Sequence, residues 1–163
     1  MGFLRKIRRL FNNNSVVDVS TLREQLSGRS RRSVFRDLSG IKHLASFTHS
    51  GKYLTLPSIA QFDPHGLWFV GNVGFSRYGT LKETIIRAIQ EADAGHTYGE
   101  LEKMFRVRSV HHTVLNLVKS KQISREVIGD RNVYVYLSSD RKQARRQLQN
   151  RLSFYKSEGV GKT

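Results

Sequence analysis

Apolar residues recur at helical spacing in two segments of this chain, and the second segment repeats the first at an offset of 76 residues. The triplet Arg-Ser-Val opens both copies, at residues 32–34 and 108–110. Residues three or four apart share one face of a helix, so we expect helices over residues 30–45 and 108–120. The positions that would face the core are Val34, Leu38 and Ile41 in the first copy and Val110, Val114 and Leu117 in the second.

Shorter segments with helix-start signals precede these two helices. A Thr followed three residues later by Glu predicts a capping box, in which each side chain satisfies a backbone N–H of the other residue. The pairs are Thr21 and Glu24, Thr80 and Glu83, and Thr97 and Glu100. We expect the helices that they open to end near Leu26, Ala92 and Phe105.

Each of the two longer helices is followed by a pattern that is typical of a β-hairpin. In the first copy, residues 45–49 and 52–56 flank Ser50-Gly51, which predicts a two-residue turn. In the second copy, residues 123–127 and 133–137 flank Gly129-Asp130. We therefore expect one hairpin after each longer helix.

The segment 57–79 is rich in glycine and aromatic residues, and its periodicity is weak. We expect a short helix over 57–62 and then an irregular hairpin. Aromatic side chains are unusual in a flexible linker, so these should be buried against both halves of the chain and fix their relative orientation. They are Phe62, Trp68, Phe69, Phe75 and Tyr78.

Both ends of the chain predict basic amphipathic helices. Residues 3–11 carry Ile7 and Phe11 on an apolar side, and this helix could pack on the body, bind a second copy, act as a nucleic-acid arm or lie on a membrane surface. A helix from Ser139-Asp140 to about Ser157 has an apolar stripe that would suit a homodimer interface. The stripe comprises Ala144, Leu148, Leu152 and Tyr155.

The charge of the chain favours a polyanionic partner. The formal net charge is +15, and residues 1–11, 29–42 and 140–163 together supply +13 of it. There is no cysteine, which removes disulfides, zinc fingers and thiol catalysis and fits a cytoplasmic, nucleoid-associated protein. No apolar run is long enough to span a membrane.

Catalytic and cofactor signals are weak throughout. The terminal Gly-Lys-Thr lacks the earlier glycine of a phosphate-binding loop, and acidic residues are too scattered for a magnesium-dependent nuclease. The six histidines show no metal-ligand spacing on a helix. We expect no enzymatic activity, no metal and no cofactor.

The outer faces of the two longer helices carry hydrogen-bond donors. With the apolar positions turned inward, an arginine-rich stripe faces out in the first copy, and an arginine fork can pair with guanine edges or with phosphate. The candidate nucleic-acid-binding residues of the first copy are Arg29, Arg31, Arg32, Ser33, Arg36 and His43, with Lys52 on the hairpin. Those of the second copy are Arg108, His112, Asn116 and Lys119, with Arg131 on the hairpin and Arg141 and Arg145 on the terminal helix.

The segment 21–38 resembles the helix-turn-helix of prokaryotic winged-helix DNA-binding proteins, including transcription regulators and the end-recognition domains of mobile-element proteins. Residues 97–137 resemble the same fold less closely. The resemblance implies that Arg31, Arg32, Ser33 and Arg36 occupy recognition-helix positions. One departure is that residues 15–20 look extended, so the helix at 3–11 would serve as the first helix of that domain.

These patterns predict an α+β, mainly helical fold with two winged helix-turn-helix domains in tandem and basic terminal helices. The first domain covers 1–79 and includes the connector 57–79, the second covers 80–138, and a basic helix and tail cover 139–163. We expect sequence-specific binding of double-stranded DNA, by a transcription regulator or an accessory factor of a mobile element or plasmid. The second copy could instead be a packing or dimerisation module, and the alternative functions are RNA binding and a non-enzymatic interaction scaffold.

Overall fold

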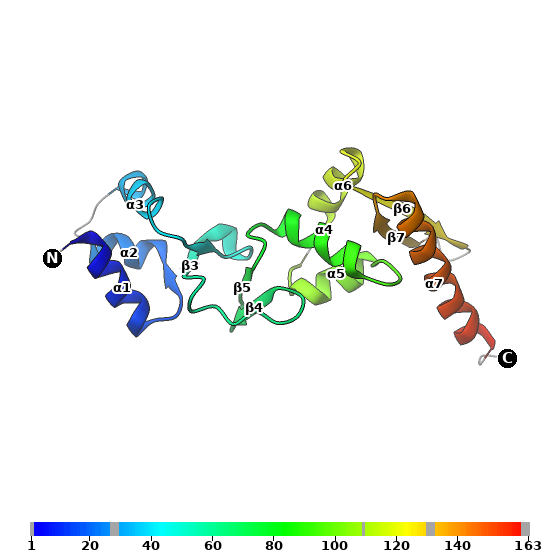
Figure 1. Ribbon diagram of the computed structural model, residues 1–163, viewed down its shortest axis with the longest axis horizontal. Coiled ribbons are helices and arrows are strands. Elements are labelled where there is room, and N and C mark those ends of the chain that lie inside the picture. Colours follow the sequence, from blue (N-terminus) through cyan, green and yellow to red (C-terminus); the bar gives the residue numbers. More distant parts are fainter. Residues whose placement is uncertain (1, 27–29, 109, 130–132, 161–163) are drawn as a thin grey trace. The chain divides into compact units, whose positions relative to one another are not determined.

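The computed structural model describes residues 2–26, 30–108, 110–129 and 133–160, with side chains described up to Tyr155 (Figure 1). The chain forms two compact units, Met1–Thr80 and Leu81–Thr163. Helices and small antiparallel sheets alternate in both units, so the fold is α+β. Each unit has its own core.

The first unit combines three helices with a small sheet. The helices are α1 (Phe3–Asn13), α2 (Val19–Gln25) and α3 (Arg31–Leu38), and the strands are β1 (Val17–Asp18), β2 (Leu44–Ala45) and β3 (Tyr53–Thr55). The strands pair antiparallel in the order β1-β3-β2. A second hairpin follows, formed by β4 (Leu67–Val70) and β5 (Val73–Ser76).

Helix α1 is part of the core of the first unit. Its Ile7 and Phe11 are buried, and they join a cluster with residues of α2, α3 and β3. The other buried members of this cluster are Val17, Val19, Leu22, Leu26, Val34, Leu38 and Leu54. The basic residues of α1 remain on its exposed side, so the helix packs on the body of the unit.

Helix α3 is shorter than its apolar spacing predicts, because it ends at Leu38 and not near residue 45. Ser39 and Gly40 stop it. The Ser39 hydroxyl donates to the Arg36 carbonyl at 2.5 Å, and Gly40 is a weak helix former. Ile41 is still half-buried against the core, because its N–H bonds the Leu38 carbonyl in a turn.

The start of α2 also differs from the prediction. The helix begins at Val19, and its N-cap is Asp18, whose carboxylate accepts a hydrogen bond from the Thr21 N–H at 2.7 Å. That hydrogen bond is the main reason why the pKa of Asp18 lies below its usual range. The capping box expected at Thr21 and Glu24 is therefore wrong.

The loop between β2 and β3 is longer than the predicted two-residue turn. It runs from 46 to 52 and contains a short 3₁₀ turn, His49–Gly51, whose residues all have positive φ. Ser46 stabilises it by donating from its hydroxyl to the Thr48 carbonyl at 2.7 Å. These polar contacts replace the strand ladder that the sequence pattern predicted for residues 46–49.

The β4–β5 hairpin is tied to this loop. Phe47 donates its N–H to the Gly74 carbonyl at 2.9 Å, and the Gly74 N–H donates to the Thr48 hydroxyl at 3.0 Å. The Phe47 and Phe69 rings meet edge to face at 5.9 Å. The helix expected over residues 57–62 is absent: residues 57–59 form a turn and residues 60–62 are irregular. The expected role of the aromatic residues in orienting the two halves stays a prediction.

The second unit has the helices α4 (Leu81–Glu91), α5 (Tyr98–Phe105), α6 (His111–Lys119) and α7 (Arg141–Val160) and the hairpin β6 (Ile123–Ile128) and β7 (Val133–Ser138). The two strands pair from Ile123 opposite Ser138 to Ile128 opposite Val133. His96, just before α5, pairs with Tyr136 of β7. The apolar core is built from Ile85, Ile89, Leu101, Phe105, Val110, Val114, Leu117 and Leu137.

The capping box at Thr97 and Glu100 is confirmed, since both reciprocal hydrogen bonds are present at the start of α5. Helix α6 begins at His111, later than predicted, with Val110 as its N-cap residue, while Arg106 ends α5 in a left-handed conformation. Helix α7 covers one face of the hairpin. Its Ala144, Leu148 and Tyr155 pack on Ile128, Val135 and Leu137.

Candidate nucleic-acid interface

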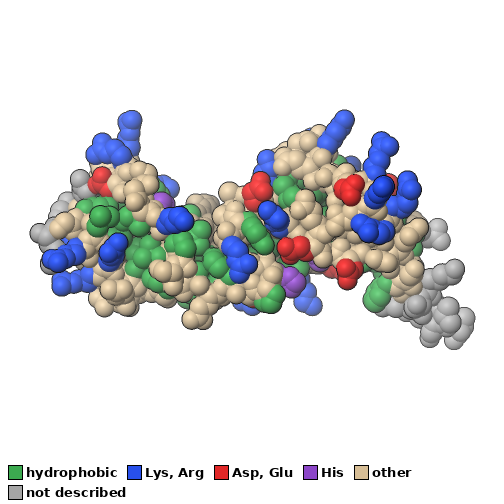
Figure 2. Space-filling model, in the orientation of Figure 1, with side chains coloured by type: hydrophobic (Ala, Val, Ile, Leu, Met, Phe, Trp, Pro, Cys, Tyr) green, Lys and Arg blue, Asp and Glu red, His purple; other side chains and the backbone are tan. Residues whose placement is uncertain are grey.

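Helix α3 places three arginines on its outer side. Ser30 caps the helix by accepting the Ser33 N–H at 3.1 Å, while Val34 and Leu38 are fully buried. This anchoring leaves Arg31, Arg32 and Arg36 exposed. In Figure 2, Lys and Arg side chains project from the region of α3 at the upper left.

The first turn of α3 carries charge of the unfavourable sign for a helix. Arg31 and Arg32 stand at the positive end of the helix dipole, and the turn contains no acidic residue. A cation there typically costs a few tenths of a kcal/mol up to about 1 kcal/mol. The Arg31 guanidinium lies 5.4 Å from the Phe35 ring centroid, which offsets part of this cost, and Arg36 stands in the last turn, where the dipole favours a cation.

The other predicted residues of the first copy lie at different depths. Ser33 is half-buried, and its hydroxyl oxygen lies 3.0 Å from that of Ser30, so the cap engages it. His43 is not on α3, because the helix ends before it. Its ring Nδ1 lies 2.9 Å from the Ile41 carbonyl, which leaves it half-buried in the segment before β2.

Lys52 is exposed at the end of the β2–β3 loop. Its ammonium lies 5.3 Å from the Tyr53 ring centroid, and the His49 ring meets the same tyrosine edge to face at 5.3 Å. The ammonium of Lys52 thus lies over the face of the neighbouring Tyr53 ring. Arg29 and Arg131, which were predicted as binding residues, lie outside the described residues.

The second unit presents a less basic helix at the corresponding place. His112, Asn116 and Lys119 are exposed on α6, as predicted. Arg108 is exposed too, but it precedes α6 and does not belong to its outer face. Compared with α3, this helix offers a histidine, an asparagine and one lysine in place of three arginines.

Arg141 and Arg145 lie on another side of the second unit. They line an open groove of about 490 Å³ together with Ser124, Glu126 and Ser139, on the face of the hairpin that α7 covers. The structure does not bring them onto the face of the hairpin that carries Arg125. Glu126 also places an acidic group in their groove.

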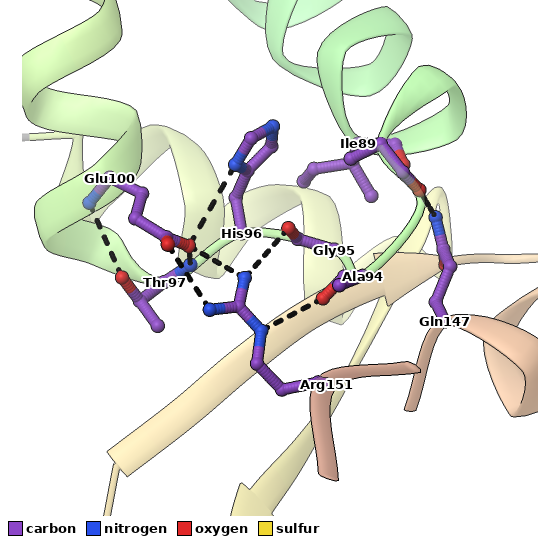
Figure 3. Close-up of polar contacts among 9 residues, drawn as sticks. Ile89, Ala94, Gly95, His96, Thr97, Glu100, Gln147 and Arg151 are labelled. Atoms are coloured by element: carbon purple, nitrogen blue, oxygen red, sulfur yellow. Dashed lines mark hydrogen bonds and ion pairs between the residues drawn. The ribbon is translucent and has the colours of Figure 1, made fainter. Parts of the chain in front are cut away.

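Arg151 lies on the same basic helix as Arg141 and Arg145, but its side chain is only 8% exposed and does not face solvent. It forms a fork on the Glu100 carboxylate, with hydrogen bonds of 2.7 and 3.1 Å, and also donates to the Ala94 and Gly95 carbonyls (Figure 3). These contacts hold α7 against the segment between α4 and α5.

Gln147 is a buried residue that sequence reasoning missed. Its amide nitrogen donates to the Ile89 and Ala92 carbonyls at 2.7 and 2.8 Å, and its oxygen accepts from the Ser138 N–H at 2.8 Å. The signal in the sequence was the spacing of Gln143, Gln147 and Arg151 along one stripe of the helix. These three side chains donate hydrogen bonds to carbonyls at the end of α4 and in the segment that follows it.

Searches with the chain against protein-family models, curated proteins and solved structures gave no match. Among the residues that the structure describes, no three His, Asp or Glu side chains are grouped so that they could hold a metal ion. None of the described helices has the length and the apolar run that crossing a membrane requires.

Proposed function

We propose that this chain binds double-stranded DNA with sequence specificity, through two winged helix-turn-helix units of which the first supplies the main recognition helix. The observation that carries the proposal is the exposed set Arg31, Arg32 and Arg36 on α3, a helix whose opposite side is fully buried. A transcription regulator or an accessory factor of a mobile element or plasmid would use such a helix.

The order of the elements supports the winged-helix interpretation. In the first unit the chain runs helix, strand, helix, helix, strand, strand, and the last strand pairs between the other two. The second unit follows the same order, with the His96 pairing to Tyr136 in the place of the first strand. In this arrangement the third helix is the one that enters a major groove.

The geometry of α3 suits contact with base edges. Helices of this kind contact bases chiefly with their N-terminal residues, and Arg31 and Arg32 occupy the first turn. Each can present two parallel N–H groups to guanine. Lys52, on the loop that follows, would neutralise a backbone phosphate and position the helix without reading sequence.

The second unit would contribute by α6 at a neighbouring segment, through His112, Asn116 and Lys119. These donors carry less charge, so we expect them to add less to affinity than the arginines of α3. The binding free energy would come largely from phosphate neutralisation and would fall steeply with salt.

The test is selection of bound sequences from a random duplex pool, with the whole chain at about physiological salt. A single enriched motif supports the proposal, and its loss in the double variant Arg31→Ala, Arg32→Ala assigns the reading to α3. Strong binding without any enriched motif would contradict sequence specificity. Preference for a hairpin RNA over duplex DNA in competition would favour the RNA-binding alternative, and a protein partner kept by the double variant would favour the scaffold.

A further inference from the structure

The β6–β7 hairpin has one face that α7 does not cover. Residues opposite each other in a ladder lie on the same face, so the pairs Arg125 with Tyr136 and Val127 with Tyr134 share one side. Helix α7 packs on the other side, against Ile128, Val135 and Leu137. Near the end of the hairpin, the uncovered face exposes 45% of Val127 and 38% of Tyr134.

Aromatic rings connect this face to the start of α6, and we call them the aromatic strip. Tyr134 lies 6.5 Å from Tyr136, which lies 4.8 Å from Tyr98 at the start of α5. Tyr98 lies 5.5 Å from His111, the first residue of α6, and His111 lies 5.7 Å from His112. The strip is therefore continuous from the hairpin to the helix at which a nucleic acid is expected.

The ends of the aromatic strip are accessible and its centre is buried. Tyr134, His111 and His112 are exposed, whereas Tyr136 is fully buried and serves as the support. Burial is the main reason why the pKa of Tyr136 lies above its usual range. The exposed rings thus rest on a buried aromatic support.

A cation is fixed at the exposed end of the strip. The Arg125 guanidinium lies 4.3 Å from the Tyr134 ring centroid, the distance of a stacked pair. The second unit as a whole is basic, with 16 Lys and Arg against 9 Asp and Glu. An aromatic surface with an adjacent arginine on a basic domain fits a ligand that has both flat rings and phosphates.

We infer that the aromatic strip binds single-stranded DNA, with an unpaired base stacked at Tyr134 and its neighbouring phosphate paired with Arg125. Single strands are bound in this way because every base has a π-face and the backbone between bases is anionic. Paired bases cannot offer their faces, so a duplex would use α6 but leave the strip unfilled.

Deoxyribose is the better fit for the sugar. The exposed apolar neighbour of Tyr134 on this face is Val127, which cannot form a hydrogen bond with a 2′-hydroxyl. A thymine methyl group and a deoxyribose would both make apolar contacts there.

This inference goes beyond the proposed function, because it assigns a different ligand to a different unit. It rests on the proposed function only in treating the chain as a nucleic-acid-binding protein. A failure of this inference can be distinguished from a failure of the proposed function, because duplex binding would depend on Arg31 and Arg32 and single-strand binding on Tyr134. Together the two activities would suit a site where a duplex opens.

The experiment measures the fluorescence anisotropy of labelled oligothymidylate of about 15 nucleotides, a matched duplex and oligouridylate with the whole chain. Tyr134→Ala should weaken oligothymidylate binding about tenfold, the effect of losing one stacked base. Tyr134→Phe keeps the ring and should therefore bind oligothymidylate like the wild type. Duplex binding should be unchanged in both variants. The matched control is Phe62→Ala, because Phe62 also carries an arginine, Arg77, over its ring at 5.5 Å.

A second measurement identifies the contact directly. Oligothymidylate that carries 5-iodouracil should crosslink on irradiation to the peptide that contains Tyr134, and the yield should fall in Tyr134→Ala. The inference is overturned if Tyr134→Ala binds like Phe62→Ala, if crosslinks form elsewhere only, or if oligouridylate binds more tightly than oligothymidylate. It is also overturned if the wild-type chain forms dimers that Tyr134→Ala dissociates, since the strip would then bind a second copy.

Discussion

Arg151 of α7 forms two hydrogen bonds, of 2.7 and 3.1 Å, with the carboxylate of Glu100 of α5, although 51 residues separate the two in sequence. The same guanidinium donates to the Ala94 and Gly95 carbonyls, at 3.0 and 2.9 Å (Figure 3). Four hydrogen bonds from one buried side chain thus join α7, the α4–α5 connection and α5. The C-terminal helix is part of the unit's architecture.

Replacing Arg151 by Ala should therefore destabilise the second unit. It removes both charged hydrogen bonds and leaves two carbonyls with fewer partners, which we expect to cost about 2–3 kcal/mol. Urea unfolding followed by far-UV circular dichroism measures this. Arg146→Ala, an exposed arginine of the same helix, should change the free energy of unfolding by less than about 0.5 kcal/mol. Weaker DNA binding by Arg151→Ala with an unchanged free energy of unfolding would contradict this structural role and indicate that Arg151 contacts phosphate.

Glu100 should give the second unit an acid sensitivity. Partial burial opposes its ionisation, but hydrogen bonds from Arg151 and from the Thr97 N–H, with the charges of Arg151 and His96, outweigh it and lower its pKa below 4.5. A carboxyl with a lowered pKa stabilises the fold fully above its unfolded-state pKa, and this contribution is lost as the pH falls through the folded-state value.

The measurement is the free energy of unfolding of the wild type and Glu100→Gln between pH 7 and pH 3. The wild type should lose more stability than the variant below about pH 4.5, and the two curves should run parallel above it. Asp18→Asn is the control, because the lowered pKa of Asp18 comes from the Thr21 N–H in the first unit and should leave the difference at Glu100 intact. Parallel curves over the whole range would mean that Glu100 titrates as if unfolded.

Gly95 occupies a position that tolerates no side chain. Its φ is +65°, and a Cβ atom there would lie 2.4 Å from the Tyr136 carbonyl oxygen. Because that backbone belongs to the His96 pairing with β7, it cannot move away cheaply. Gly95→Ala should cost at least about 2 kcal/mol in the free energy of unfolding. Gly99→Ala is the comparison, since nothing lies within 4 Å of its Cβ position and Ala favours a helix; a similar loss in both would contradict this reading.

The sequence predicted the helices and the second hairpin well because those elements are governed by local patterns. Thr97 and Glu100 form the expected box, and Val114 and Leu117 point into the core as their spacing predicts. Prediction failed where two local signals competed. At α2, Asp18 and Thr21 are both good caps, and Asp18 prevails because Val19 and Leu22 are then buried by the helix that it starts.

The exposure of the candidate binding residues on α3 was predicted correctly only where the length of the helix did not matter. Arg32 and Arg36 face outward as expected, but His43 falls beyond the end of α3, because the apolar spacing continues through Ile41 while the backbone turns at Gly40. The burial of Arg151 could not be predicted from the sequence, for another reason. A charged residue beside an apolar stripe normally faces solvent. The partners that bury Arg151 are Glu100 and the carbonyls of residues 94 and 95, which are more than fifty residues away in sequence.

Substitutions of the arginines of α3 should show whether these side chains contact bases or only phosphates. If Arg32 or Arg36 pairs with a base edge, its replacement by Ala should cost about 1–3 kcal/mol on the selected site and relax the preference at one base pair. Lys52→Ala should weaken binding to selected and random duplexes alike and reduce the salt dependence by about one phosphate contact. Titrations of both duplexes at several salt concentrations give these quantities.

Arg9→Ala supplies the control for net charge, because Arg9 is exposed on a different helix, α1. It removes the same charge as Arg32→Ala, so any difference between the two variants reflects position and not the total of +15. If Arg32→Ala, Arg36→Ala and Lys52→Ala all lose equal affinity on selected and random DNA, then α3 makes only phosphate contacts. Sequence preference, if selection still finds it, would then have to come from α6 or from DNA shape.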